Sequence, residues 1–225
     1  MSFNSTDVDP YAGLSFLDIK RLNYPKWGHQ ITGVFLLFVG LFGFTENLLV
    51  ILTFTRNKQL LSATNIFILG VSLGDMCMVC FGNPLASTSA LNGEWFAGEA
   101  VCKFEGFIVY TFGLSQLHLL TAVSVDRYIV IAKPLLAPKI TKQVAWAAVL
   151  GCFALALLWA IFPFFGWSSY GLEAAGVFCG LHYDDLSLSN TTYIIAITIF
   201  CFFIPMGIMI FCYYHVFMTV SGFLT

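Results

Sequence analysis

Three carboxylic acids lie within long apolar stretches of this sequence, where a charge is costly. They are Glu46, Asp75 and Glu105. A carboxylate in hydrocarbon costs several kcal/mol, so it persists only with a partner, with water or as the protonated acid. Such acids can hold a buried cation, exchange a proton or join a polar network. We expect Asp75 and Asn47 to form a network of the last kind, between two helices.

Glu46 is adjacent to Asn47 and is assigned to the same predicted network. We interpret it as a protonated acid that is hydrogen-bonded inside the bundle, with proton or ion movement as the alternative. Glu105 lies one turn inside its helix from Cys102 and would face a central cavity if Cys102 faces an outer loop.

The sequence does not indicate an enzyme. The histidines are scattered and no nucleophile–base pair or metal-ligand spacing recurs, so we predict no catalytic site and no metal site. The four histidines are His29, His118, His182 and His215. His118 is interpreted as a packed, hydrogen-bonded core residue.

The elements that must hold the acids are membrane-spanning helices. Of 225 residues, 59% are hydrophobic and 10% are charged, and the mean hydropathy is +0.85, which excludes a soluble domain. We therefore predict an all-α, polytopic membrane helix bundle. Apolar runs of spanning length fall at 31–55, 64–90, 102–133, 144–166 and 191–219.

The orientation is predicted from the flanking segments. Residues 1–30 lack the apolar core of a signal peptide, so we expect an extracellular N-terminus ahead of the bundle at 31–220 and a tail at 221–225. Basic residues are slightly more frequent in the connections then placed inside. Asn4 and Asn190 begin possible glycosylation triplets, both on the predicted outer side. A multi-pass plasma-membrane protein is the expected product.

The cysteines predict a covalent cover over the outer end of the bundle, and the prolines predict kinks in its helices. Cys102 and Cys179 fall at the outer surface, where disulfides persist, and we predict that they are bonded and tie the loop 167–190 over the bundle. Prolines inside spans kink helices and open space between them, where a ligand would bind. These prolines are Pro84, Pro163 and Pro205.

With these residues in view, the sequence resembles the animal opsins, which are rhodopsin-like G-protein-coupled receptors. The match covers about 30–220. The rhodopsin-like pattern consists of Asn47, Asp75, Cys102, Asp126-Arg127-Tyr128, Cys179, Pro205 and Tyr213. The opsin pattern consists of 162–170, Glu173 and 178–180, with 102–107 and 211–214. One departure is Phe153, where most opsins have tryptophan.

The resemblance implies a photoreceptor that binds retinal and activates a heterotrimeric G protein. It implies that the five spans are the first five of seven helices. Opsins bind retinal through a lysine in helix seven, and no lysine of this sequence is expected at mid-membrane. We therefore expect an incomplete chain that forms no retinal linkage by itself.

Site residues are also implied by the resemblance. A buried protonated Schiff base needs a nearby carboxylate, because desolvation disfavours the cation. Glu105 matches the helix-three counterion of vertebrate visual opsins and Glu173 the outer-loop acid of many others, and the sequence does not choose between them. Asp126, Arg127 and Tyr128 match the G-protein switch, with Asp126 holding Arg127 at rest. Positions matching the retinal pocket are Tyr110, Gly113, Phe178, Tyr183 and Phe202.

Other functions are weighed against this interpretation. Val109 stands where amine receptors have aspartate, which disfavours an amine ligand. A peptide or lipid receptor and an opsin-type retinal photoisomerase stay open. A transporter would show paired helix breaks or an inverted repeat, and neither appears. The expected partners are the lipid membrane, a G protein and a second receptor in a possible dimer, without nucleic acid.

Overall fold

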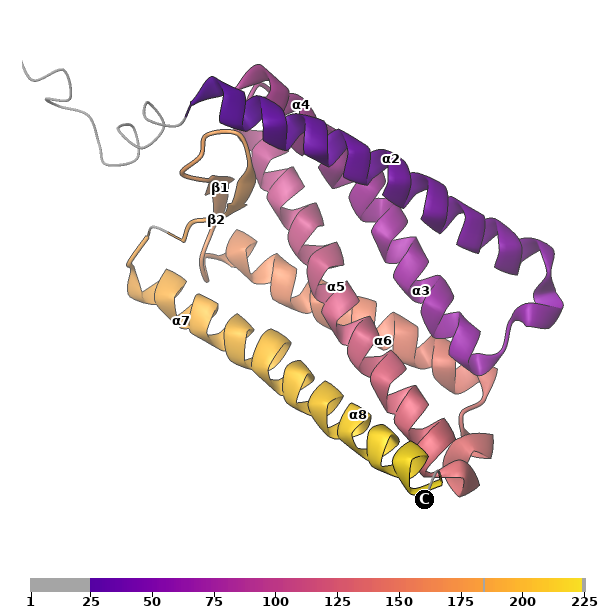
Figure 1. Ribbon diagram of the computed structural model, residues 1–225. Coiled ribbons are helices and arrows are strands. Elements are labelled where there is room, and N and C mark those ends of the chain that lie inside the picture. The colour runs from indigo at the N-terminus through magenta and orange to yellow at the C-terminus, as the bar shows by residue number, and fades with distance from the viewer. Residues whose placement is uncertain (1–24, 184, 224–225) are drawn as a thin grey trace, which may run out of the picture.

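The computed structural model describes residues 25–183 and 185–223, and in this part of the chain five helical segments are long and apolar enough to cross a membrane (Figure 1). The predicted all-α membrane bundle is therefore confirmed. The first and third spans are α2 (Lys26–Arg56) and α5 (Gly98–Ala132). The second combines α3 (Ala63–Cys77), η2 (Met78–Gly82) and α4 (Asn83–Asn92). The fourth combines α6 (Lys142–Ile161) and η4 (Phe162–Phe165), and the fifth α7 (Leu188–Thr198), η5 (Ile199–Phe203) and α8 (Ile204–Phe223).

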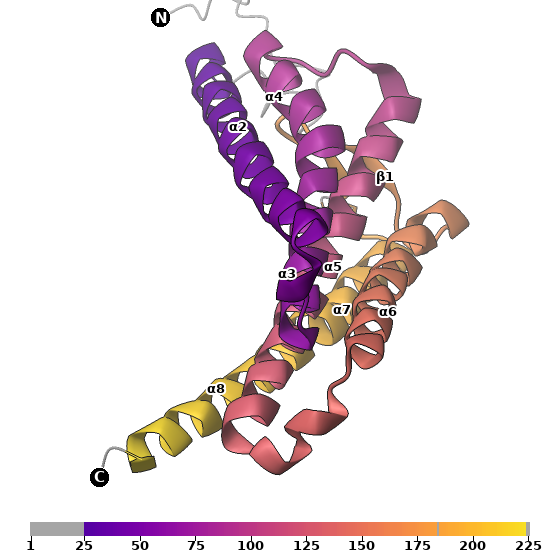
Figure 2. The same cartoon turned by 90° about the vertical axis from the view of Figure 1, so that its right-hand side faces the viewer.

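The central element is α5, which packs against α3, α6, α8 and the outer loop. Figure 2 shows α2 on one side of α5 and α6 on the other. Two short helical connections, η1 (Lys58–Leu60) and η3 (Pro134–Lys139), close the inner end between spans. This arrangement gives one helix contact with nearly every other part of the bundle.

The helices begin earlier than hydropathy predicts, because their first turns are polar. The first span starts at Lys26, inside the segment assigned to the N-terminus, and the fifth starts at Leu188 instead of 191. Ser62, Thr141 and Ser187 accept hydrogen bonds from backbone N–H groups in the first turns of α3, α6 and α7. Such caps fix a helix start without any apolar side chain.

Two π-helical turns stand just before prolines inside spans. The segment η2 ends one residue before Asn83-Pro84, and η5 ends one residue before Ile204-Pro205. Proline has no N–H, and its ring clashes with the carbonyl four residues earlier, so the preceding turn widens while the helix continues. The predicted proline distortions are therefore π-helical turns in two of the spans.

The outer loop contains the one feature that the all-α prediction omitted. Strands β1 (Tyr170–Leu172) and β2 (Cys179–Leu181) pair antiparallel, with Tyr170 opposite Leu181. Three-residue strands are too short to show an alternating pattern. The hairpin packs against α5 at Gly106, where an added Cβ would lie 2.9 Å from the Tyr170 ring. Glycine thus permits the close approach.

Candidate functional site

The outer site is built around Glu105, which is only 2% exposed in the first third of α5. The backbone N–H of Cys179 donates to its carboxylate, which stabilises the charged form. The other oxygen, Oε2, is buried and has no hydrogen-bond partner in the described part of the chain. A buried acid with one open oxygen can accept a proton or face a cation.

Glu173 approaches the same place from the turn between β1 and β2, and it is near enough to act electrostatically on Glu105. Its backbone N–H donates to the Phe178 carbonyl at 2.9 Å. Its carboxylate lies against Gly180, where an added Cβ would overlap Oε1. Burial raises the pKa of the Glu173 carboxyl above its ordinary value.

Neither Glu105 nor Glu173 forms an ion pair with a basic side chain of the described residues. Among residues 25–183 and 185–222, the only ion pair is Glu99 with Lys103, at 2.6 Å on the outer turns of α5. Lys103 is therefore paired with the exposed Glu99 and not with either buried acid. Two neighbouring buried acids could therefore accommodate a positive group between them.

The predicted disulfide is confirmed. Cys102 in α5 is bonded to Cys179 in β2, with their Cα atoms 5.3 Å apart and 77 residues between them in sequence. The other five cysteines are free. The bond holds the hairpin against the helix one turn from Glu105.

A tyrosine pair extends the site deeper into the bundle. The hydroxyls of Tyr110 in α5 and Tyr183 after β2 are hydrogen-bonded to each other. The Tyr110 ring meets the Tyr170 ring edge-on at 5.9 Å, and the Tyr170 hydroxyl donates to the Ala160 carbonyl at 2.8 Å. Burial raises the pKa of the Tyr170 phenol, so it stays a neutral donor. These contacts join α5, the loop and α6.

The remaining expected pocket residues are dispersed. Phe178 is half-buried beside Cys179, close to the acids. Gly113 faces η2, where an added Cβ would lie 3.8 Å from the Met78 methyl group. Phe202 is 44% exposed, and the ring contact described for it is with Phe203. The structure therefore gathers Tyr110, Tyr183 and Phe178 around the hairpin and leaves Phe202 without a described contact to them.

The inner end of α5 differs from expectation in one contact. Asp126 is 2% exposed and accepts a 2.8 Å hydrogen bond from the Thr64 hydroxyl of α3. It forms no ion pair with Arg127 in the described structure, and its carboxylate is instead bonded to α3. Tyr128 packs against Phe211 and His215 of α8, each at 5.7 Å.

The polar network predicted between Glu46, Asn47 and Asp75 is not formed among the described residues. Glu46 is exposed on α2, and the Asn47 amide donates to Gly43 of its own helix at 2.9 Å. Asp75 is half-buried, and no described hydrogen bond joins it to either residue. These contacts depend on how each helix is rotated about its axis. Hydropathy predicts where a span lies but not its rotation.

Other amides provide the links between helices. Asn83 of α4 donates to the Leu36 carbonyl of α2 at 3.0 Å, and Gln116 of α5 donates to the Val71 carbonyl of α3 at 2.9 Å. Sequence reasoning overlooked both residues. Polar amides inside apolar runs are the signal that could have identified them.

The structure argues against glycosylation of Asn190. Its side chain is 1% exposed, and Nδ2 donates to the carbonyls of His182 at 2.7 Å and Asp185 at 2.6 Å. Its oxygen accepts from the Ser168 hydroxyl at 2.6 Å. The nitrogen that would carry a glycan is thus buried and bonded. Asn4 lies outside the described residues.

Comparisons with known proteins place these features in a family context. Residues 46–222 match the family described as the seven-transmembrane receptors of the rhodopsin family. Human melanopsin is 35% identical over 204 residues, which are 90% of this chain and 43% of melanopsin. Melanopsin of Branchiostoma belcheri is 37% identical over a match that covers 88% of this chain and 28% of that melanopsin.

A solved structure agrees with the sequence matches. The crystal structure of squid rhodopsin superposes with a TM-score of 0.82 at 31% identity, covering 88% of this chain and 57% of that chain. The chain therefore spans less than half the length of the two melanopsins named above.

Proposed function

The chain belongs to the rhodopsin family of seven-transmembrane receptors, as an opsin-type member that contains the first five helices, and we propose that it forms the counterion-bearing part of a light-sensing receptor. The family consists of receptors and not of enzymes. Location in the plasma membrane with the N-terminus outside is part of the proposal.

One observation carries the proposal: an oxygen of the buried Glu105 has no hydrogen-bond partner among the described residues, and Glu173 is near enough to interact with it electrostatically. Such a pair fits a positively charged chromophore, because a carboxylate stabilises a cation that burial alone would disfavour. Bound retinal would supply light absorption and a cationic linkage. Glu105 would balance that charge, while the hairpin would exclude water from it.

The tyrosine pair and Phe178 support the same proposal. The Tyr110–Tyr183 hydrogen bond ties the loop to α5, so the loop and the acids are held as one unit. The Phe178 carbonyl accepts a hydrogen bond from the Glu173 backbone N–H, so an apolar residue is close to that acid in the loop. Pockets for elongated apolar ligands combine such rings with a few fixed polar groups.

The retinal-bearing lysine is proposed to lie in the helix seven that the opsin resemblance implies. The described lysines stand at span ends or in connections: Lys26, Lys58, Lys103, Lys133, Lys139 and Lys142. None of these six is at mid-span. They do not offer an amine in the centre of the bundle.

At the inner end we propose a site for a heterotrimeric G protein. Arg127 has no described ion-pair partner, so its guanidinium is available to a docking segment. Tyr128 contacts α8 through Phe211 and His215, so a displacement of α8 would move the residue next to Arg127. Through this contact, a change of ligand in the outer site that displaces α8 would also change the inner surface around Arg127.

The test joins the chain with helices six and seven of an opsin by co-expression and adds retinal. We expect a visible absorption band, and Glu105→Gln or Glu173→Gln should shift it to the near ultraviolet at neutral pH, because the cation loses its counterion. Glu99→Gln is the matched control, since Glu99 is exposed and paired with Lys103. An unchanged band in both acid variants would contradict the counterion assignment.

A second measurement separates the remaining functions. Light-dependent nucleotide exchange on a G protein is expected of a photoreceptor. Release of a changed retinal isomer without exchange would favour a photoisomerase. Absence of any retinal adduct in the reassembled receptor would favour a peptide or lipid ligand.

A further inference from the structure

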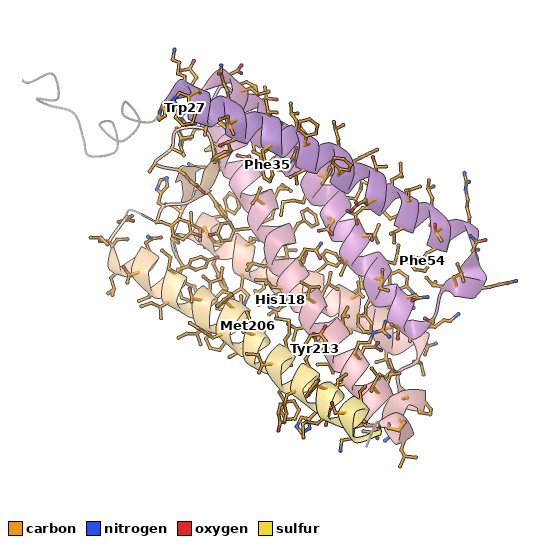
Figure 3. The ribbon with its side chains drawn as sticks, in the orientation of Figure 1. Trp27, Phe35, Phe54, His118, Met206 and Tyr213 are labelled. Atoms are coloured by element: carbon orange, nitrogen blue, oxygen red, sulfur yellow. A yellow bond between two sulfur atoms is a disulfide. The ribbon has the colours of Figure 1, made fainter. Side chains whose placement is uncertain are left out.

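Three exposed lysines stand at the inner end of the bundle, away from the outer acids. Two connections reach this end, η1 between α2 and α3 and η3 between α5 and α6. Figure 3 labels Phe54 near the inner end of α2, just ahead of η1, and Trp27 at the outer end. Lys58 begins η1, Lys139 ends η3 and Lys142 begins α6. We call these three residues the inner lysines.

Hydrophobic packing brings the two connections together. Leu61, which follows η1, and Trp146 of α6 pack against one buried cluster. That cluster contains Ile66 of α3 and Ala145 of α6, and Ala63, the first residue of α3, also packs against it. Figure 1 shows the beginnings of α3 and α6 side by side. The corner between η1, α3 and α6 is therefore a single packed unit.

The inner lysines surround this corner. Lys58 is one 3₁₀ turn before Leu61, whose backbone N–H donates to the Lys58 carbonyl at 3.3 Å. Lys142 is one turn before Ala145 and lies on the same face of α6. The Cα atoms of Lys139 and Lys142 are at most about 11 Å apart, because three residues reach no further. Three ammonium groups thus come from two connections to one corner.

No acid neutralises the inner lysines. The sequence at 56–64 and 127–146 contains six basic residues and neither aspartate nor glutamate. The adjoining acid, Asp126, is 2% exposed and is bonded to Thr64. Within 25–183 and 185–222 none of the inner lysines forms an ion pair, whereas the outer Lys103 is paired with Glu99. Because neighbouring like charges repel, an anion at this corner would be stabilising.

The spans place this corner at the level of the lipid headgroups. The second span begins at Ala63 and the fourth at Lys142, so hydrocarbon starts directly beside the inner lysines. Leu60 and Val144 are 48% and 51% exposed next to them. A lysine at such a boundary directs its ammonium group to the polar layer, while apolar side chains contact acyl chains. The anion that fits both surfaces is a phospholipid.

We propose that the corner between η1, α3 and α6 binds an anionic phospholipid, whose headgroup lies among Lys58, Lys139 and Lys142. A zwitterionic headgroup has no net charge and gains less from three cations. The cytoplasmic leaflet, which the proposed orientation places at this end, is the one rich in anionic lipids. The assignment goes beyond light sensing, because it uses neither the outer acids nor Arg127.

The first experiment places the chain in nanodiscs of phosphatidylcholine with a trace of photoreactive phosphatidylserine. We expect crosslinks at η1 and at the beginnings of α3 and α6. Lys142→Gln should lower this labelling about fivefold, the equivalent of about 1 kcal/mol for one cation near an anionic lipid. Lys26→Gln is the matched control, because Lys26 is also the first residue of a span but lies at the outer end. Equal labelling of the two variants would overturn the proposal.

The second experiment tests charge and lipid character in the native chain. Excess phosphatidylserine should remove the crosslinks at this corner, and the same excess of phosphatidylcholine should not. Soluble glycerophosphoserine, which has the headgroup without acyl chains, should compete poorly. Lys142→Arg should keep the labelling, because it retains the charge. Competition by phosphatidylcholine or by glycerophosphoserine as strong as by phosphatidylserine would contradict the assignment, even if Lys142→Gln fails to fold. Both results are independent of retinal, so they stand apart from the test of the photoreceptor.

Discussion

The two ends of α5 are held in different ways. At the outer end the Cys102–Cys179 bond, the Cys179 N–H on Glu105 and the Tyr110–Tyr183 pair fix the helix to the loop. At the inner end the Thr64–Asp126 hydrogen bond and the packing of Tyr128 on α8 provide the contacts described above. The outer end is covalently fixed, whereas the described contacts at the inner end are noncovalent.

This difference suits a receptor. A covalent link keeps the acids and the loop at constant separation, as the proposed chromophore site would require. A hydrogen bond between membrane helices contributes only about 0.6–2 kcal/mol, so a ligand can change the inner contacts with little free energy. The four predictions below test this difference, starting with the largest effect.

Cys179→Ser should lower the free energy of unfolding by about 2–5 kcal/mol, because the bond closes a 77-residue loop. Thermal unfolding in detergent would measure the loss. Cys80→Ser is the control, since Cys80 is free and exposed. Equal melting temperatures for the two variants, or a reactive Cys102 thiol in unreduced protein, would contradict the rigid outer end.

Asn190→Ala should destabilise the protein by about 2–4 kcal/mol, because three buried hydrogen bonds are lost. Asn190→Asp keeps the acceptor and should lose less. Endoglycosidase treatment should show the same glycan content before and after substitution. A glycan that disappears in the variant would restore the original sequence prediction.

Thr64→Val should cost about 1–2 kcal/mol and release Asp126, while Thr64→Ser should be nearly neutral because it retains the hydroxyl. In the reassembled receptor the valine variant should show raised basal nucleotide exchange. If valine and serine variants behave alike, Thr64 does not restrain the inner end.

The smallest effect concerns pH. Burial raises the folded-state pKa of Glu173 above its ordinary value of 4.5, so the folded state binds more protons than the unfolded state above that pH. Stability from this group is therefore greatest below pH 4.5 and falls as pH rises toward the raised pKa. Glu173→Gln should flatten this slope in melting curves. A steeper slope in the variant would reverse the sign argued here.

The spans and the disulfide could be predicted, because each depends on a property that one segment carries by itself. Hydrocarbon requires about 20 apolar residues, and Cys102 and Cys179 are the two cysteines predicted outside it. The contacts of Glu46, Asn47 and Asp75 could not be predicted, because they depend on how each helix is rotated relative to its neighbours. Glu46 faces outward, although its neighbour Asn47 is half-buried.

The outer site shows the same limit. The resemblance indicated Glu105 and Glu173, and the structure brings them together through a hairpin too short to leave a sequence pattern. It did not indicate Thr64 or Ser168, whose partners are 62 and 22 residues away.

The π-helical turn η5 sets the rotational phase of the last span. One additional residue in a turn rotates everything beyond it by about 100° relative to an uninterrupted α-helix. Phe211 and His215 therefore meet Tyr128 only because this residue is present. Deleting a single codon within 199–203 would preserve the length and hydrophobicity needed to cross the membrane. It would nevertheless turn the inner half of α8 away from α5, so this receptor should be far more sensitive to indels there than to most substitutions.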